Sequence, residues 1–159
     1  MKLIQILSLL FLIIACEREL QNNYQLETNF NPSSRESTLY LMKNNTKTDS
    51  LTVGDWYGKD SIYQVDSLNW KYFYSQRCGT GCSVTNQMLI KIEENRMKKI
   101  YDSLAYYTYH SVVIDSINGT TTNKLIEYDS VNIVKKDSIW YLIHKKYADG
   151  IMAKDEKKL

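Results

Sequence analysis

The sequence has little net charge, few histidines and no long hydrophobic run, and each shortage excludes a class of protein. Its 20 lysines and arginines almost balance 18 aspartates and glutamates, so a net charge of +2 provides no basic surface for nucleic acid. No G-x-S-x-G, H-E-x-x-H or P-loop motif occurs, and no cofactor is expected. With 43% hydrophobic residues, the chain is nevertheless apolar enough to fold as one modest domain.

The longest apolar segment lies at the N-terminus, where Met1-Lys2 precedes the run Leu3–Ile14. Gln5 and Ser8 are its only polar residues. At about 1.5 Å per residue a helix of this length covers roughly 18 Å, well short of a hydrocarbon core about 30 Å thick. A short basic start followed by an apolar run of this length is typical of a signal peptide.

The end of this run, Ile13-Ile14-Ala15-Cys16, resembles the lipobox of bacterial lipoproteins, in which an aliphatic, a variable and a small residue precede a cysteine. The resemblance implies cleavage before Cys16, a diacylglycerol thioether on its sulfur and an acyl chain such as palmitate on the new amine. Each buried CH₂ is worth about 0.8 kcal/mol, so two or three chains give essentially permanent anchoring. We therefore expect a lipoprotein of the cell envelope, anchored at the outer membrane. An ordinary secretory signal with a chance cysteine, or a buried N-terminal strand, is the alternative.

Composition divides the chain into four parts. Residues 1–15 are the expected signal peptide, and residues 16–38 are polar, aperiodic and contain the only proline, Pro32. This second part is expected to form a flexible tether behind the lipidated cysteine. Residues 39–149 are expected to form the folded domain, and the charged residues 150–159 a C-terminal tail.

The start of the folded domain allows two interpretations. Ser33–Glu36 has the spacing of a capping box, which predicts a short helix through Met42. A strand over Leu39–Met42 fits almost as well.

The folded domain is rich in strand signals. Six segments carry β-branched and aromatic residues: Trp70–Arg77, Val84–Ile92, Arg96–Asp102, Tyr106–Ile114, Thr121–Tyr128 and Ile139–Tyr147. The breaks between them are short, and Asn118-Gly119 is the favoured pair for a tight type I′ turn. Short connections join antiparallel neighbours. We therefore predict a mainly β fold, an antiparallel meander of six to nine strands that forms an open sheet or a small barrel.

An Asp-Ser-aliphatic triplet occurs seven times without a fixed period, which excludes a solenoid or propeller. Asp and Ser side chains bond nearby backbone groups and favour turns, so the triplets are expected to mark the beginnings of strands. No D-x-D-x-D-G calcium loop is present.

Cys78 and Cys82 remain once Cys16 is assigned to the lipid. Two glycines between them allow the chain to turn back, and an isolated pair in an exported protein predicts a disulfide. Thioredoxin-like redox chemistry is an alternative, although it uses C-x-x-C at a helix start. A zinc site or a hydrolytic site would have to recruit His110 or His144, the only histidines. Neither metal nor catalytic residues are expected.

The 13 tyrosines are an unusual feature of the composition. Trp70, Tyr72 and Tyr74 would project from one face of a strand, where an aromatic strip can contact a sugar, a peptide or an apolar ligand. Aromatic residues are also good strand formers, so packing in the sheet is the alternative.

The segment Trp70–Ile92, an aromatic strand followed by a close cysteine pair and an apolar strand, resembles part of a family of small uncharacterised bacterial lipoproteins. The three residues between the cysteines depart from the tighter pair of that family, and the resemblance implies no activity. The leading prediction is a lipid-anchored, non-enzymatic module that binds an unknown protein, glycan or small apolar ligand. A lipocalin-like carrier is the alternative, and an envelope redox or hydrolytic enzyme is a third.

Overall fold

The computed structural model describes residues 24–115, 117–148 and 150–159, and these form ten β-strands. The proposed signal peptide and Cys16 lie outside the described residues. The strands are β1 (Tyr24–Asn31), β2 (Glu36–Lys43), β3 (Thr46–Gly54), β4 (Ser61–Gln64), β5 (Asn69–Gln76), β6 (Cys82–Glu93), β7 (Arg96–Asp115), β8 (Thr120–Lys136), β9 (Ile139–Ala148) and β10 (Ile151–Lys158).

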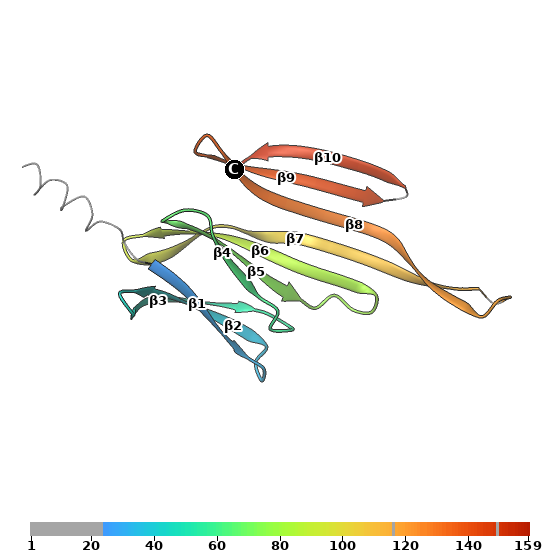
Figure 1. Cartoon of the computed structure of the whole chain (residues 1–159), viewed down its shortest axis with the longest axis horizontal. Coiled ribbons are helices and arrows are strands. Elements are labelled where there is room, and N and C mark those ends of the chain that lie inside the picture. The colour runs from blue at the N-terminus through green and yellow to red at the C-terminus, as the bar shows by residue number, and fades with distance from the viewer. Residues whose placement is uncertain (1–23, 116, 149) are drawn as a thin grey trace, which may run out of the picture.

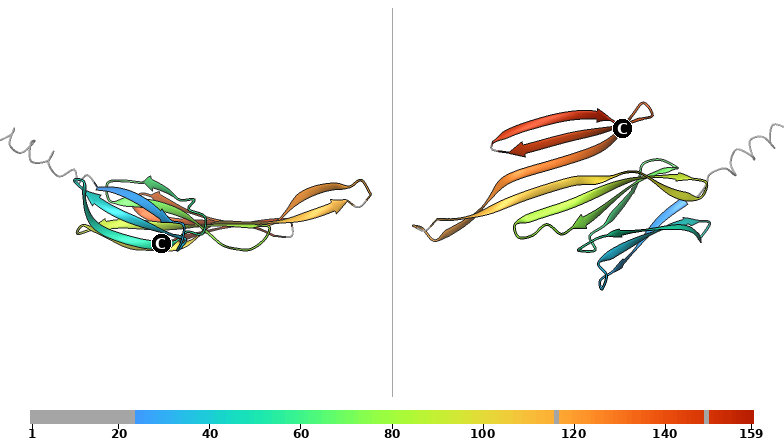
Figure 2. Two further views of the ribbon diagram at one scale, coloured as in Figure 1. Left: turned by 90° about the horizontal axis from the view of Figure 1, so that it is seen from below. Right: turned by 180° about the vertical axis from the view of Figure 1, so that it is seen from behind.

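Two open antiparallel meanders make up the fold. One sheet has three strands in the order β1-β2-β3, and the other has seven in the order β10-β9-β8-β7-β6-β5-β4 (Figure 1). The three-stranded sheet lies against one face of the larger sheet (Figure 2). The predicted antiparallel β fold is thus confirmed in its open-sheet form, although the described residues form ten strands in two sheets rather than one meander of six to nine. In the part of the chain that the structure describes, no helix is long and apolar enough to cross a membrane.

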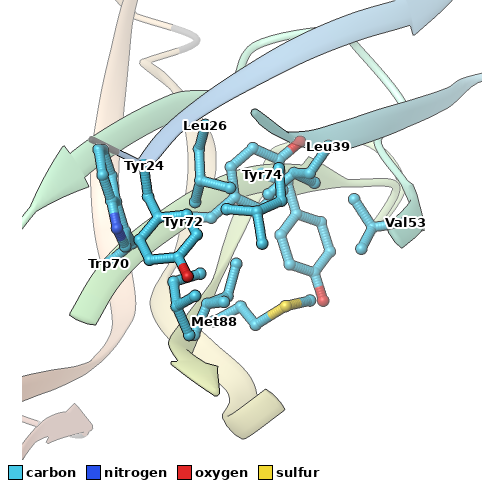
Figure 3. Close-up of a cluster of buried hydrophobic side chains, with 11 residues drawn as sticks. Tyr24, Leu26, Leu39, Val53, Trp70, Tyr72, Tyr74 and Met88 are labelled. Carbon is cyan, nitrogen blue, oxygen red and sulfur yellow. The ribbon is translucent and has the colours of Figure 1, made fainter. Parts of the chain in front are cut away.

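The core lies between the two sheets. Alternate residues of each strand point to the same face. Leu39 and Leu41 of β2 belong to the same buried cluster as Met88 and Ile90 of β6. Side chains from β1, β2 and β3 meet those of β5 and β6 in Figure 3. The buried cluster consists of Tyr24, Leu26, Leu39, Leu41, Val53, Trp70, Tyr72, Tyr74, Met88, Ile90 and Ile92.

Three hairpins turn on two residues that both have positive φ, the geometry of a type I′ turn. These pairs are Asn44-Asn45 between β2 and β3, Glu94-Asn95 between β6 and β7, and Asp137-Ser138 between β8 and β9. The β6–β7 turn also joins the two sheets, because the side chain of Asn95 accepts hydrogen bonds from Tyr24 (2.8 Å) and Lys43 (2.9 Å).

Strand β8 has two different neighbours along its length. It pairs with β7 only as far as Ser130, and its remaining residues pair with β9 alone. The carbonyls of Val131 and Ile133 instead accept hydrogen bonds from the side chains of Gln87 and Lys71, and Ile133 is fully buried. Beyond the end of β6, the β7–β8 hairpin continues as a two-stranded arm that projects from the molecule (Figure 2).

Two predicted segment boundaries are wrong. The expected tether over residues 16–38 instead contains β1 and the start of β2 from Tyr24 onward, because Tyr24 and Leu26 alternate inward and β1 pairs along its whole length with β2. The expected charged tail forms β10, whose side chains are exposed on both faces and which is held by pairing with β9. Residues 16–23 lie outside the described residues.

The two interpretations of residues 33–42 are resolved in favour of a strand, since the capping-box segment leads into β2 rather than a helix. The segments Arg96–Asp102 and Tyr106–Ile114 form one continuous strand, β7. The Asn118-Gly119 turn has four residues rather than two, because Asp115 pairs with Thr120.

The Asp-Ser triplets do not all mark turns. Those at Asp49, Asp102 and Asp129 lie inside strands. Each of these aspartates binds a specific partner: Asp49 accepts the Met97 amide (2.7 Å), Asp102 accepts the Tyr74 hydroxyl (2.6 Å), and Asp129 contacts His144. Long-range contacts therefore override the local turn preference at these positions.

Candidate functional site

Two arginines and a tryptophan meet at one end of the sandwich. Arg35 lies in the β1–β2 turn, Trp56 follows β3, and Arg77 follows β5. The guanidinium carbons of Arg35 and Arg77 lie 4.0 Å and 5.0 Å from the centroid of the Trp56 ring. Together with Gly54 and Gln76 they line an open pocket of about 200 Å³. We call this group the Arg35–Trp56–Arg77 cluster.

Backbone hydrogen bonds bring these three segments together. The Asp55 amide donates to the Arg35 carbonyl at 3.1 Å, and the Trp56 amide donates to the Ser75 carbonyl at 3.0 Å. The segment after β3 therefore joins the smaller sheet to β5 of the larger one. Arg35 has a φ of 57°, and its amide donates to Asn31 at 2.8 Å, which closes the β1–β2 turn.

A buried carboxylate lies beneath the cluster. Asp55 is fully buried and accepts hydrogen bonds from the Ser37 hydroxyl (3.1 Å), the Ser75 amide (3.2 Å) and the Ser75 hydroxyl. Such bonds offset the desolvation cost of a buried charge. Because Ser37 belongs to β2 and Ser75 to β5, this carboxylate fixes the relative position of the two sheets below the pocket.

Among the described residues, Arg35 and Arg77 have no anionic partner. In the described parts of the chain neither guanidinium forms an ion pair, although Glu36 and Asp55 are close in the sequence. Both charges lie within 5.0 Å of one ring centroid, so they are separated by about one Debye length at most. A bound anion would relieve the mutual repulsion of these two charges.

A larger groove of about 730 Å³ lies at the other end of the sandwich, beside Tyr24 and Met97. Three of its charges are paired with one another, because Glu93 accepts hydrogen bonds from Lys91 at 2.7 Å and from Lys98 at 3.4 Å. These contacts lower the pKa of the Glu93 carboxyl, the hydrogen bond from Lys91 having the largest effect. Glu94 and Arg96 also line the groove, so it presents charges of both signs to a ligand.

A third concave surface of about 600 Å³ lies on the outer face of β4 and β5. Tyr63 and Phe73 form an edge-to-face pair there, with ring centroids 5.7 Å apart. Lys71 lines this surface, but its ammonium group already donates to the Ile133 carbonyl, and burial lowers its pKa. This leaves a shallow apolar surface with its cation already bonded.

The candidate ligand-contact aromatics Trp70, Tyr72 and Tyr74 lie in the core, where they are only 8%, 0% and 5% exposed. The packing interpretation therefore applies to all three, and no exposed aromatic strip forms on this face. Tyr72 and Tyr74 stack on each other with centroids 5.6 Å apart. Burial raises the pKa of Tyr74, and its hydrogen bond to Asp102 raises it further.

The sulfur atoms of Cys78 and Cys82 lie at bonding distance, 2.06 Å apart, with 5.9 Å between their Cα atoms. This supports the predicted disulfide. The loop that it closes is attached to β7, since the His110 amide donates to the Gly81 carbonyl at 2.9 Å.

The two histidines are not brought together in a cleft. His110 is exposed on β7, whereas His144 on β9 contacts Asp129 at 2.6 Å. This histidine–carboxylate pair lines none of the pockets described above. In the described residues no group of three or more His, Cys, Asp or Glu side chains could hold a metal ion.

Comparisons of the chain with protein-family models, with curated proteins and with solved structures give no match. The protein is an open two-sheet antiparallel β-sandwich with a cation–indole cluster at one end.

The Arg35–Trp56–Arg77 cluster is not predicted by the sequence patterns described above. Its members are about 20 residues apart in the sequence, and no spacing rule connects them. The only local signal is Gly54-Asp55-Trp56-Tyr57, in which a turn-forming pair precedes two aromatic residues between strands.

Proposed function

We propose that this protein is a lipid-anchored, non-enzymatic binding module of the bacterial cell envelope, anchored through Cys16 at the outer membrane. It binds its ligand or partner at the Arg35–Trp56–Arg77 cluster. The observation that carries this proposal is the position of the cluster at the end of the sandwich opposite the first described residue, Tyr24 (Figure 1).

The geometry of β1 supports this orientation. The strand runs from Tyr24 to Asn31, so its eight residues separate the two ends by roughly 25 Å. Only eight residue steps lie between Cys16 and Tyr24, and they reach about 27 Å at most. An anchor at Cys16 therefore holds the Tyr24 end within about 27 Å of the headgroups, while the cluster lies roughly 25 Å further along β1.

Fatty-acid labelling tests the anchor. The full chain is expressed in a bacterial host with an alkyne-bearing fatty acid, beside a Cys16→Ser variant. We expect label and membrane-fraction recovery for the wild type only, with the acyl mass increment on Cys16. Label that persists in the variant, or an unlabelled wild type, would contradict the proposal.

Energy transfer tests the orientation. A fluorophore is attached through an azide-bearing side chain at Asn45 or at Thr80, and the lipidated chain is reconstituted in vesicles with an acceptor lipid. Asn45 lies in the β2–β3 turn near the Tyr24 end, and Thr80 lies in the disulfide loop beside Arg77. We expect more efficient transfer from position 45, and equal transfer would rule out this orientation.

No observation favours the carrier alternative. A lipocalin-like carrier needs a closed barrel around a cavity. In the described residues both sheets are open, and the side chains of the core occupy the space between them.

A further inference from the structure

We propose that the Arg35–Trp56–Arg77 cluster binds an oxyanion, a phosphate or carboxylate group carried by a larger envelope molecule. The inference rests on the proposed function for its biological setting, but the binding chemistry follows from the cluster itself. Guanidinium groups present planar pairs of N–H donors that match carboxylate and phosphate oxygens.

Two guanidinium groups over one indole ring distinguish this cluster, because each of the other four cation–π contacts in the described residues has a single lysine over its ring. Five lysines of the described residues each form an ion pair with a carboxylate: Lys91, Lys98, Lys99, Lys135 and Lys136. Arg35 and Arg77 form none, although they lie over the same ring. A bound oxyanion would supply the negative charge that the two arginines lack.

The arginines are also held in place before a ligand arrives. Stacking on Trp56 restricts both guanidinium groups, and cation–π attraction favours this arrangement. The ring itself is positioned by the Trp56–Ser75 backbone bond and by the buried Asp55 beneath it. Restricting donors in advance reduces the ordering cost of binding.

The size of the pocket limits what part of a ligand it takes. A volume of about 200 Å³ is below the range of about 300–1,000 Å³ that is usual for whole small-molecule ligands. It is sufficient for an anionic group and the atoms next to it. Gly54 leaves one side open, since a Cβ placed there would meet no atom within 4 Å. The remainder of the ligand would extend into solvent on this side.

Equilibrium dialysis against labelled pyrophosphate tests the site with the full chain purified in detergent, at constant ionic strength. We expect saturable binding of one ion per chain, weakened roughly tenfold or more by combining Arg35→Gln with Arg77→Gln, since each charge-assisted hydrogen bond exceeds a tenfold increment. The matched control combines Lys154→Gln with Lys157→Gln on the exposed strand β10 and should bind as the wild type does. Glucuronate in place of pyrophosphate separates carboxylate from phosphate recognition.

Protection from arginine modification gives a second readout that needs no variant. Phenylglyoxal is added to the wild-type chain with and without pyrophosphate, and the modified sites are found by mass spectrometry. We expect pyrophosphate to slow modification of Arg35 and Arg77 but not of Arg96, which is exposed at the other end. Equal protection at all three sites, or binding retained by the double arginine variant, would overturn the proposal. If fatty-acid labelling fails, the proposed lipid anchor is wrong, but pyrophosphate binding and protection from phenylglyoxal still test the oxyanion site.

Discussion

Ser75 of β5 and the buried carboxylate of Asp55 join the two sheets of this protein. The Ser75 amide donates to Asp55 at 3.2 Å and its hydroxyl donates to the same oxygen, while the Asp55 side chain also accepts Ser37 from β2. The carboxylate thus connects the two sheets through hydrogen bonds, directly under the candidate site.

We expect Asp55→Ala to lower the free energy of unfolding by about 3 kcal/mol, because it leaves buried donors of Ser37 and Ser75 without an acceptor. Urea unfolding followed by circular dichroism measures the loss. Asp155→Ala is the matched control, since Asp155 is exposed on β10 and should change stability by less than about 0.5 kcal/mol. Equal losses of unfolding free energy in the two variants would show that the buried hydrogen bonds of Asp55 do not stabilise the fold.

Gly58 is expected to tolerate alanine less well than Gly119 does. Both have nearly the same positive φ, 62° and 64°, so the backbone cost of a side chain is alike at the two positions. A Cβ at Gly58 would lie 2.6 Å from the Phe30 ring, whereas one at Gly119 would meet no atom within 4 Å. We expect Gly58→Ala to cost at least about 1 kcal/mol more in thermal or urea unfolding.

The pKa of Asp66 should lie well below that of an ordinary aspartate. Burial acts in the opposite direction, but hydrogen bonds from Lys135 (2.7 Å), the Leu68 amide (3.0 Å) and Asn69 together lower this pKa to about 2. Because the folded-state pKa is depressed, the stabilisation is present above about pH 4 and is lost as the pH falls toward 2. The Asp66 side chain is 32% exposed, so screening limits its ion pair to about 1 kcal/mol or less.

Carboxyl-carbon NMR over pH 1.5–6 measures this pKa directly. Lys135→Gln should raise it toward the ordinary range, and Lys154→Gln on the exposed strand should leave it unchanged. An identical titration in both variants would refute the assignment to Lys135.

The Cys78–Cys82 pair should yield no free thiol in the oxidised protein, even after denaturation. A closed loop of five residues contributes about 2 kcal/mol in the chain-entropy model, so combining Cys78→Ser with Cys82→Ser should lower stability by that amount. Reduced wild-type protein should match the double variant in urea unfolding. Rapidly reacting thiols in the folded chain would instead favour redox chemistry.

Strand positions and the fold class follow from the sequence where apolar residues alternate strongly. The Trp70 and Val84 segments are predicted almost to their ends, because Trp70, Tyr72 and Tyr74 share one face, and so do Met88 and Ile90. The sequence could not show whether that aromatic face meets solvent or a second sheet. The second sheet covers the aromatic face partly through β1. In this strand Tyr24 and Leu26 are buried and the residues next to them are polar, so the sequence shows only a weak strand pattern there.

The candidate site could not be predicted for a related reason. Its three side chains come from a turn, a loop and a strand end, and they meet only because Asp55 bonds across the sheets. Local patterns describe one strand at a time, whereas this site depends on the packing of two sheets. The same limit explains β10, whose exposed charged residues show no alternation and depend on pairing with β9.

Strand β8 changes its pairing partner along its length, and this should allow β9 and β10 to unfold locally. Past Ser130 the strand has lost its ladder to β7, and Lys71 and Gln87 side chains bond its carbonyls instead. The hairpins of β9 and β10 can therefore detach without separating β2 from β5 and β6. We therefore expect two classes of amide in a hydrogen-exchange experiment. The amides of β9 and β10 should exchange through local opening, whereas those of β5 and β6 should exchange only through global unfolding.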